Sequence, residues 1–212
     1  MSNLKTVMAC CLMLLPLFGK AQNCCDGKDE VMDNEVVRTI MSRRSVRKYL
    51  DKTVEHDKLA LIAKCGINAP SAMNRQTWAV RVVEDPEFIN GTTEIFRKEN
   101  SEQVKRDSNF RNMYRNAPNI IVVAVPENDS YAMLNAGLMG ENMMLAAESL
   151  GLGTCCLGAP VRFLQTSEAC RPYIAQLNIP EGYELCYILA VGYPDENPDA
   201  KPRDEGKIEF IK

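Results

Sequence analysis

The stretch YAMLNAGLMGENMMLAAESL at residues 131–150, followed by GLGTCCLGAP at 151–160, determines most of what can be expected of this fold. Residues 131–150 predict one long helix whose only charged side chains are Glu141 and Glu148. Its methionines and leucines lie around the whole circumference, so the helix must be buried on nearly all sides. In a chain of 212 residues the simplest way to bury it is against a second copy. The two carboxylates and the glycines at 137 and 140 disfavour a membrane span.

The residues after this helix predict a turn, a short strand and a ligand contact. Gly151-Leu152-Gly153 ends the helix, and Thr154 to Leu157 continues as a strand. Gly158 has no side chain, so a planar ligand could approach the backbone closely beside Leu157 and accept a hydrogen bond from a peptide N–H. The segment lacks the G-x-G-x-x-G order and precedes a strand, which gives no support to a dinucleotide-binding Rossmann turn.

The remaining elements predict an α+β class, because helices and strands mix without a regular βαβ repeat. Ile120 to Val125 is an uninterrupted apolar run, typical of a strand buried on both faces. Further strands are expected at 78–84 and 184–192, and further helices from a cap at Asp33, from a cap at Thr53, at 94–109 and at 161–170. The terminal residues 208–211 could add a strand to a partner.

A basic segment follows the first helix, at Arg43-Arg44-Ser45-Val46-Arg47. In extended geometry residues 43, 45 and 47 face one side, which presents two guanidinium groups and a hydroxyl to one anion. Arginine binds phosphate in a bidentate manner, so this segment favours a phosphate site. The alternative is a solvated run of charges.

Two further segments carry polar side chains in positions suited to a ligand. Pro70-Ser71-Ala72-Met73-Asn74-Arg75-Gln76-Thr77-Trp78 forms a loop that leads into a strand, and such loops often hold ligand contacts on a rigid support. Lys201-Pro202-Arg203 in the tail holds two cations at a fixed spacing. The alternatives are a helix terminator for the first segment and a solvated linker for the second.

The first residues have the layout of a secretory signal peptide. Lys5 precedes an apolar run from Val7 to Phe18, and Gly19 and Ala21 place small residues before a cleavage after Ala21. The run is too short to span a bilayer, which needs roughly 20 residues. We therefore expect a signal peptide at 1–21, a polar tether at 22–32 and one domain at 33–212, exported to the periplasm or associated with the envelope, with no membrane span in the mature chain. Lipid attachment at Cys10 or Cys24 is a weaker alternative.

Composition excludes several classes of partner and site. The net charge of −3 leaves no basic surplus to neutralise phosphates, so no nucleic acid is expected. One histidine and cysteines without zinc-site spacing argue against a metal site. Cys155, Cys170 and Cys186 are expected to fill core space, and Cys24 and Cys25 could form a disulfide outside the cytoplasm.

Taken together, the motifs resemble the nitroreductase family over residues 34–204. The residues that carry the resemblance are Arg-Arg-Ser-Val-Arg, Ala-Pro-Ser-Ala-x-Asn-x-Gln-x-Trp, Asn-Met-Met-Leu-Ala-Ala running into Leu-Gly-Leu-Gly-Thr-Cys, and Gly-Tyr-Pro followed by Lys-Pro-Arg. The resemblance implies a nitroreductase-like fold, with a central, mostly antiparallel sheet flanked by helices and a long buried helix at the dimer interface. It also implies a homodimer and FMN bound at the subunit interface. Thr77, where the family often has proline, and Glu141, where it often has glutamine, depart from the pattern.

The resemblance also implies the role of each site residue. One subunit would hold the phosphate and ribityl chain through Arg43, Arg44, Ser45, Arg47, Lys201 and Arg203. The other subunit would reach the same flavin through Pro70, Ser71, Ala72 and Asn74. Asn135 would lie near the pyrimidine edge, and Leu157 and Gly158 would line the ring, with the Gly158 N–H directed toward N5.

The implied activity is that of an oxidoreductase in which the flavin, and no catalytic side chain, carries the chemistry. Hydride would pass from NAD(P)H through the flavin to a small-molecule acceptor, a nitroaromatic or quinone, in a ping-pong cycle. Three alternatives remain: a flavin enzyme of another reaction (flavin breakdown, dehalogenation or enone reduction), a non-catalytic flavin-binding protein of the envelope, and a thiol-based redox or interaction protein that uses Cys24-Cys25 and Cys155-Cys156.

Overall fold

The computed structural model describes residues 34–212. Every helix and strand described below lies in the unit Glu35–Lys212. The expected signal peptide at 1–21, the tether at 22–32 and the cap at Asp33 lie outside the described residues. No helix among residues 34–212 is long and apolar enough to cross a membrane.

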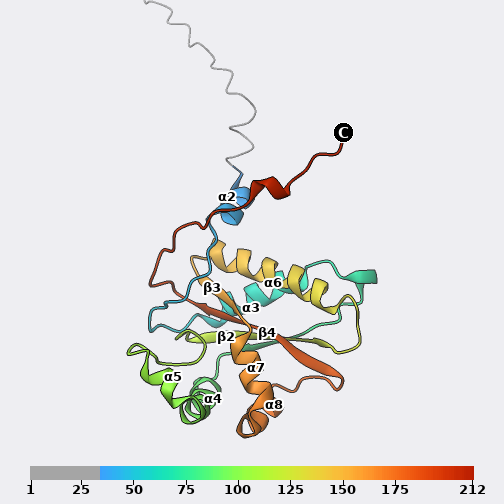
Figure 1. Ribbon diagram of the computed structural model, residues 1–212. Helices are drawn as coiled ribbons and strands as arrows, with labels where there is room; N and C mark the ends of the chain where they lie inside the picture. Colours follow the sequence, from blue (N-terminus) through green and yellow to red (C-terminus); the bar gives the residue numbers. More distant parts are fainter. Residues whose placement is uncertain (1–33) are drawn as a thin grey trace, which may run out of the picture. The chain divides into compact units, whose positions relative to one another are not determined.

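A single antiparallel sheet lies at the centre of the second unit (Figure 1). Its strands are β1 (Ala79–Val83), β2 (Asn119–Pro126), β3 (Gly153–Leu157) and β4 (Tyr183–Gly192), in the order β1-β2-β4-β3. The register pairs Ile121 with Leu189 and shifts between Val123 and Ala124, where Cys186 has no partner across the ladder. An antiparallel sheet with flanking helices confirms the predicted α+β class.

β2 is the centre of the core because side chains on both of its faces are buried. Ile120, Val122 and Ala124 pack into one apolar cluster. Ile121 and Val123 alternate with them and pack into a second cluster on the opposite face. This period of two is that of an extended strand covered on both sides, as the uninterrupted apolar run predicted.

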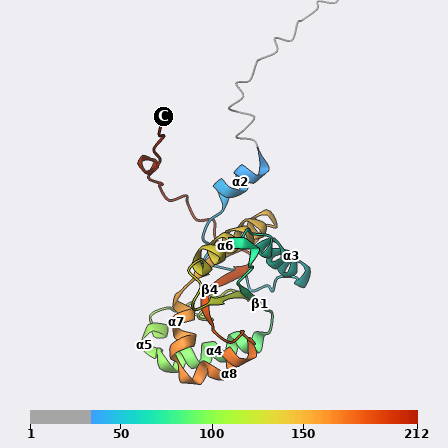
Figure 2. The same ribbon diagram turned by 90° about the vertical axis from the view of Figure 1, so that its right-hand side faces the viewer.

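Helices cover the two faces of the sheet and produce three layers (Figures 1 and 2). On one face lie α3 (His56–Ile67) and α6 (Ala132–Ser149). The other face is covered by α4 (Pro86–Glu99), α5 (Ser101–Lys105), α7 (Ala159–Thr166) and α8 (Arg171–Gln176). The first described helix, α2 (Glu35–Ser42), has no buried side chain in the described chain.

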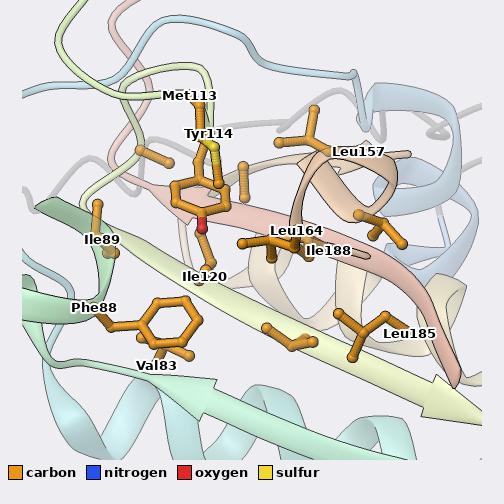
Figure 3. Packing of buried hydrophobic residues seen from close by; sticks show 14 of the residues in the cluster. Val83, Phe88, Ile89, Met113, Tyr114, Ile120, Leu157, Leu164, Leu185 and Ile188 are labelled. Carbon is orange, nitrogen blue, oxygen red and sulfur yellow. The ribbon is translucent and has the colours of Figure 1, made fainter. Parts of the chain in front are cut away.

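The cluster beneath α4 and α7 contains one buried polar pair (Figure 3). The ring of Tyr114 lies among the side chains of Ile89, Ile120 and Leu164 and is fully buried. Its hydroxyl shares a hydrogen bond of 2.9 Å with the Thr92 hydroxyl, so neither group is left unsatisfied. Burial raises the pKa of Tyr114 above its ordinary value, and the phenol stays neutral at physiological pH.

The predicted cap of α3 is wrong. α3 begins at His56, with Glu55 as its N-cap residue and without a side-chain capping bond. Thr53 lies too early because the chain is still held extended at Val54, whose N–H donates to Asn119 Oδ1 at 2.8 Å and whose side chain is buried.

The predicted helix at 94–109 is also wrong in its bounds. α4 begins at Pro86, because the Asp85 carboxylate accepts the Glu87 N–H at 2.9 Å and Phe88 and Ile89 anchor the first turns in the core. The chain breaks at Asn100 into the short α5. Likewise, the helix expected over 161–170 ends at Thr166, and α8 was not predicted.

Candidate functional site

The arginine segment, residues 43–47, is fixed to the sheet through its backbone. The Val46 N–H donates to the Thr154 carbonyl at 2.9 Å, and Ser45 pairs with Thr154 in a parallel bridge. Gly153 allows this close approach, because a Cβ there would lie 2.8 Å from Val46 Cβ. The segment therefore runs beside the first residues of β3.

The three arginines of this segment make different contacts. Arg43 Nε donates to Glu141 Oε1 on α6 at 3.1 Å. Arg44 Nη1 donates to the carbonyls of Met41 and Arg43, at 2.7 and 2.8 Å, and so satisfies the end of α2. Arg47 Nη1 donates to the Ser45 carbonyl at 3.0 Å.

The exit from β4 lies against the same segment. Tyr49 pairs with Pro194 in an antiparallel bridge, and the Arg47 N–H donates to Glu196 Oε1 at 2.5 Å. The tail therefore starts beside the arginines. Lys201 and Arg203 lie farther along it, both exposed. Among the described residues, their one hydrogen bond is internal, from Arg203 Nη1 to the Lys201 carbonyl.

The loop from Pro70 to Thr77 has a strained backbone. Met73, Asn74 and Gln76 all adopt positive φ, at 53, 54 and 52°, although none is glycine. Each such residue costs on the order of 1–3 kcal/mol and persists only where its surroundings impose the conformation. Ser71 Oγ helps to impose it by accepting the Gln76 N–H at 2.9 Å.

The side chain of Asn135 on α6 holds this strained loop through two hydrogen bonds. Its side chain is buried, its Oδ1 accepts the Ala72 N–H at 3.1 Å, and its Nδ2 donates to Thr77 Oγ1 at 3.4 Å. The Thr77 hydroxyl in turn donates to Asp129 Oδ2 at 2.9 Å. Both ends of the Asn135 amide therefore bond the loop. Hydrogen bonds from the Tyr131 N–H and the Thr77 hydroxyl lower the pKa of Asp129.

Leu157 and Gly158 lie at the far end of β3 from the arginine segment. Leu157 is buried, whereas Gly158 is exposed and a Cβ built on it would meet no atom within 4 Å. The space beside its backbone is open. Gly158 lies four steps along the chain from Thr154, about 13 Å at roughly 3.3 Å per step. An elongated ligand with an anion at one end and a flat ring at the other could follow this strand.

One chain does not bring all the predicted site residues together. The 70–74 loop contacts α6 near its start, at Asn135, whereas the arginine segment contacts it at Glu141. The cavity beside Arg44, lined also by Val46, Glu148 and Glu196, has a volume of about 160 Å³. Ligand pockets usually measure about 300–1,000 Å³. A single described chain therefore offers parts of a site.

A larger cavity, of about 360 Å³, lies between β1 and α8. Its cation, Arg81, donates from Nε and Nη2 to the carbonyls of Leu177 and Asn178, both at 2.6 Å. With its donors engaged by backbone, Arg81 is poorly placed to hold an anionic ligand. We therefore assign the candidate site to the arginine segment despite its smaller cavity.

The two adjacent cysteines of β3 lie in different surroundings. Cys155 is buried and Cys156 exposed, and both are free thiols. Burial raises the pKa of Cys155, which favours its protonated, less nucleophilic form. Cys170 is buried, as expected of a core-filling residue, whereas Cys186 is only half-buried and burial raises its pKa to about 11. Cys24 and Cys25 lie outside the described residues.

Comparison with known proteins places this arrangement in a family. A family model described as the nitroreductase family matches residues 40–193, from the end of α2 to the exit of β4. The chain belongs to the nitroreductase family. The match includes the arginine segment, the strained loop and Gly158, while Lys201 and Arg203 follow it.

Individual relatives of this nitroreductase-family protein agree. It is 31% identical over 176 residues to a protein of Archaeoglobus fulgidus named for NADH dehydrogenase/NAD(P)H nitroreductase, with 81% of this chain and 92% of the relative covered. It is 27% identical over 176 residues to the NADPH-flavin oxidoreductase of Vibrio harveyi, covering 80% and 70%. Its fold matches the crystal structure of a nitroreductase with bound FMN from Bacteroides fragilis at a TM-score of 0.71 and 28% identity, covering 84% and 100%.

Sequence reasoning assigned no contact to three residues of the candidate site, Thr77, Glu141 and Glu196. Thr77 and Glu141 stood out only as departures from the family pattern, and their partners, Asp129 and Arg43, could not be read from spacing. Glu196, which accepts the Arg47 N–H, gave no signal at all.

Proposed function

We propose that this protein is an FMN-dependent oxidoreductase that takes hydride from NAD(P)H and passes it to a small-molecule acceptor. The observation that carries the proposal is the alignment along β3 of the arginine segment at one end and the open backbone of Gly158 at the other. Two relatives support it: the Vibrio harveyi protein is named an NADPH-flavin oxidoreductase, and the Bacteroides fragilis structure is described as a nitroreductase with bound FMN.

The donor set fits the cofactor. Arg43, Ser45 and Arg47 supply guanidinium and hydroxyl donors suited to a phosphate, and Gly158 leaves room for a ring. Arg44 would contribute from its position at the end of α2. Lys201 and Arg203 would join the phosphate only if the tail folds back over the arginine segment.

When bound, FMN would supply the redox chemistry by accepting hydride from the nicotinamide and delivering it to a nitroaromatic or quinone in a ping-pong cycle. The chain's own residues would bind and orient. The arginines would neutralise the phosphate, and the Gly158 backbone would present an N–H in a site with open access. The sole histidine, His56, is engaged with Glu84 on the surface, and the proposed reaction gives it no role.

We further propose that the working unit is a homodimer formed through α6 and α2. Met133, Leu134 and Leu138 on α6 are exposed by 67, 58 and 41%, and Ile40 and Met41 on α2 are exposed as well. Leaving such an apolar face in water is unfavourable, and a second copy would cover it. The partner's 70–74 loop, with Pro70, Ser71, Ala72 and Asn74, would then complete the site over the arginine segment.

Export is a separate proposal that rests on residues 1–21 alone. Cleavage after Ala21 would leave the tether and domain in the periplasm or envelope. N-terminal sequencing of the protein recovered from its native cell fractions tests this, and an intact Met1 on the recovered protein would contradict it.

The binding proposal is tested by the variant Arg47→Ala. Charge-assisted hydrogen bonds contribute about 1.5–3 kcal/mol, so its affinity for FMN should fall by roughly 10- to 100-fold. Titration of the flavin-free protein with FMN, followed by flavin fluorescence, measures the loss. Arg171→Ala is the matched control. Arg171, the first residue of α8, pairs with Glu168 just before the helix, and its loss should leave the affinity unchanged.

Three outcomes separate the proposed activity from its rivals. Yellow protein whose flavin band bleaches with NADH or NADPH and recovers with an acceptor supports it. Bound FMN that no donor reduces indicates a flavin-binding protein without turnover. Colourless protein that binds no FMN, with activity abolished by cysteine-to-serine variants, indicates the thiol alternative.

A further inference from the structure

The contact between Arg43 and Glu141 joins the arginine segment to the middle of α6. Arg43 Nε lies 3.1 Å from Glu141 Oε1, and the two side chains are 19% and 45% exposed. The partly buried guanidinium is therefore held by a carboxylate that solvent and ligands can still reach.

Both ends of this contact are rigidly mounted. On α6, Gly140 packs against the sheet so closely that a Cβ would lie 2.6 Å from the Tyr187 hydroxyl, and that hydroxyl donates to the Ala136 carbonyl at 2.9 Å. On the other side, Ser42 Oγ donates to Glu148 Oε1 at 2.9 Å and ties the end of α2 to α6. Glu141 and Arg43 therefore meet between fixed backbones.

The carboxylate uses only one edge of the guanidinium. In the part of the chain that the structure describes, Nη1 and Nη2 of Arg43 form no hydrogen bond. The Nη1 atoms of Arg44 and Arg47, in contrast, donate to backbone carbonyls. A guanidinium is planar, so fixing Nε also fixes the direction of the Nη1–Nη2 edge. That edge can form two parallel hydrogen bonds with a phosphate.

We infer that Glu141 is a positioning residue that holds Arg43 ready for the anionic end of the cofactor. This inference rests on the proposed FMN site. The ligand and Glu141 would lie on different edges of the Arg43 guanidinium. The positive charge between them would reduce the repulsion between the two anions. Because Arg43 is already ordered, less side-chain freedom is lost when the anion binds.

The test compares two variants of Glu141 in the flavin-free full chain. Glu141→Ala removes the acceptor and should weaken FMN binding by roughly 3- to 10-fold, the usual cost of ordering one long side chain. Glu141→Gln keeps an oxygen that can accept from Nε and should restore wild-type affinity. Riboflavin, which lacks the phosphate, should bind all three proteins equally.

Two further variants exclude indirect effects. In an Arg43→Ala background, Glu141→Ala should cause no additional loss, because the carboxylate acts through that arginine alone. Glu102→Ala removes an equal charge from an exposed pair on α5 and should leave FMN binding unchanged.

The outcomes separate this inference from the proposed function. FMN binding that is equal in wild type and Glu141→Ala overturns the inference and leaves the cofactor proposal standing. So does a loss that the glutamine variant shares, that riboflavin also shows, or that persists without Arg43. If the wild-type chain binds no FMN, both proposals fall.

Discussion

At the scale of single residues, His56 and Glu84 form a surface pair that links the start of α3 to the end of β1. His56 Nδ1 lies 2.8 Å from Glu84 Oε1. The hydrogen bond to Glu84, and then its charge, raise the pKa of His56 above 6.5. The protonated pair therefore stabilises the fold fully below pH 6.5, and this contribution is lost as the pH rises through the folded-state pKa.

The chain contains one histidine, which makes this pair directly measurable. A proton NMR titration of the His56 ring should give a pKa above 6.5, and Glu84→Gln should bring it down toward 6.5 because the carboxylate is gone. Glu87→Gln, an exposed carboxylate on α4, is the control. An unchanged pKa in the Glu84 variant would contradict the pairing.

Sequence reasoning identified side chains better than their partners. Arg43, Ser45 and Arg47 were predicted because an alternating pattern is visible in the chain itself. Asn135 was predicted as a ligand contact by resemblance, and the structure shows it bonding Ala72 and Thr77. Such partners depend on tertiary proximity, which no local spacing encodes. Whether Asn135 also meets the flavin stays a prediction.

At the scale of elements, the contact between the arginine segment and β3 depends on the absence of a side chain at 153. All three branching carbons of Val46, which are Cβ, Cγ1 and Cγ2, would lie 2.8 Å from a Cβ at that position. Val46 is buried and β-branched, so it has little freedom to turn away.

Gly153→Ala should lower the free energy of unfolding by about 1–3 kcal/mol through overpacking. Combining it with Val46→Ala should cost less than the sum of the two single changes, because the smaller side chain makes room. Urea denaturation at one fixed protein concentration measures all four proteins. Strict additivity would show that the two residues do not touch in solution.

The elements themselves were predictable where one pattern dominated. The apolar run of β2 and the long α6 were located within a residue or two, since each sequence is apolar throughout and offers no competing polar period. Helix starts were harder. The start of α3 depends on Asn119, which holds Val54 extended. The start of α4 depends on the cap at Asp85, which precedes the predicted range of 94–109.

At the scale of the whole molecule, α6 shows two different faces. Ala136, Met139 and Met143 are fully buried against the sheet and α3, whereas Met133, Leu134 and Leu138 face outward. The sequence predicted that α6 is buried on nearly all sides. In the single described chain only the face toward the sheet and α3 is buried. The remainder is what the proposed dimer would cover.

Leu134→Asp together with Leu138→Asp should convert the dimer to monomer, because association would bury unpaired carboxylates. Light scattering coupled to gel filtration measures the mass, and bound flavin should be lost along with the dimer. Gln103→Asp on α5, across the sheet, adds charge without touching the proposed interface. Variants that stay dimeric with FMN bound would place the subunit contact elsewhere.

The left-handed residues of the 70–77 loop have a consequence for how this molecule can evolve. Met73, Asn74 and Gln76 hold free energy that a glycine-rich loop would release. Glycine at these positions would relieve the strain and stabilise the fold, but its greater backbone freedom would loosen the placement of Ser71 and Ala72. Selection for durability and selection for ligand handling therefore pull in opposite directions on the same few residues.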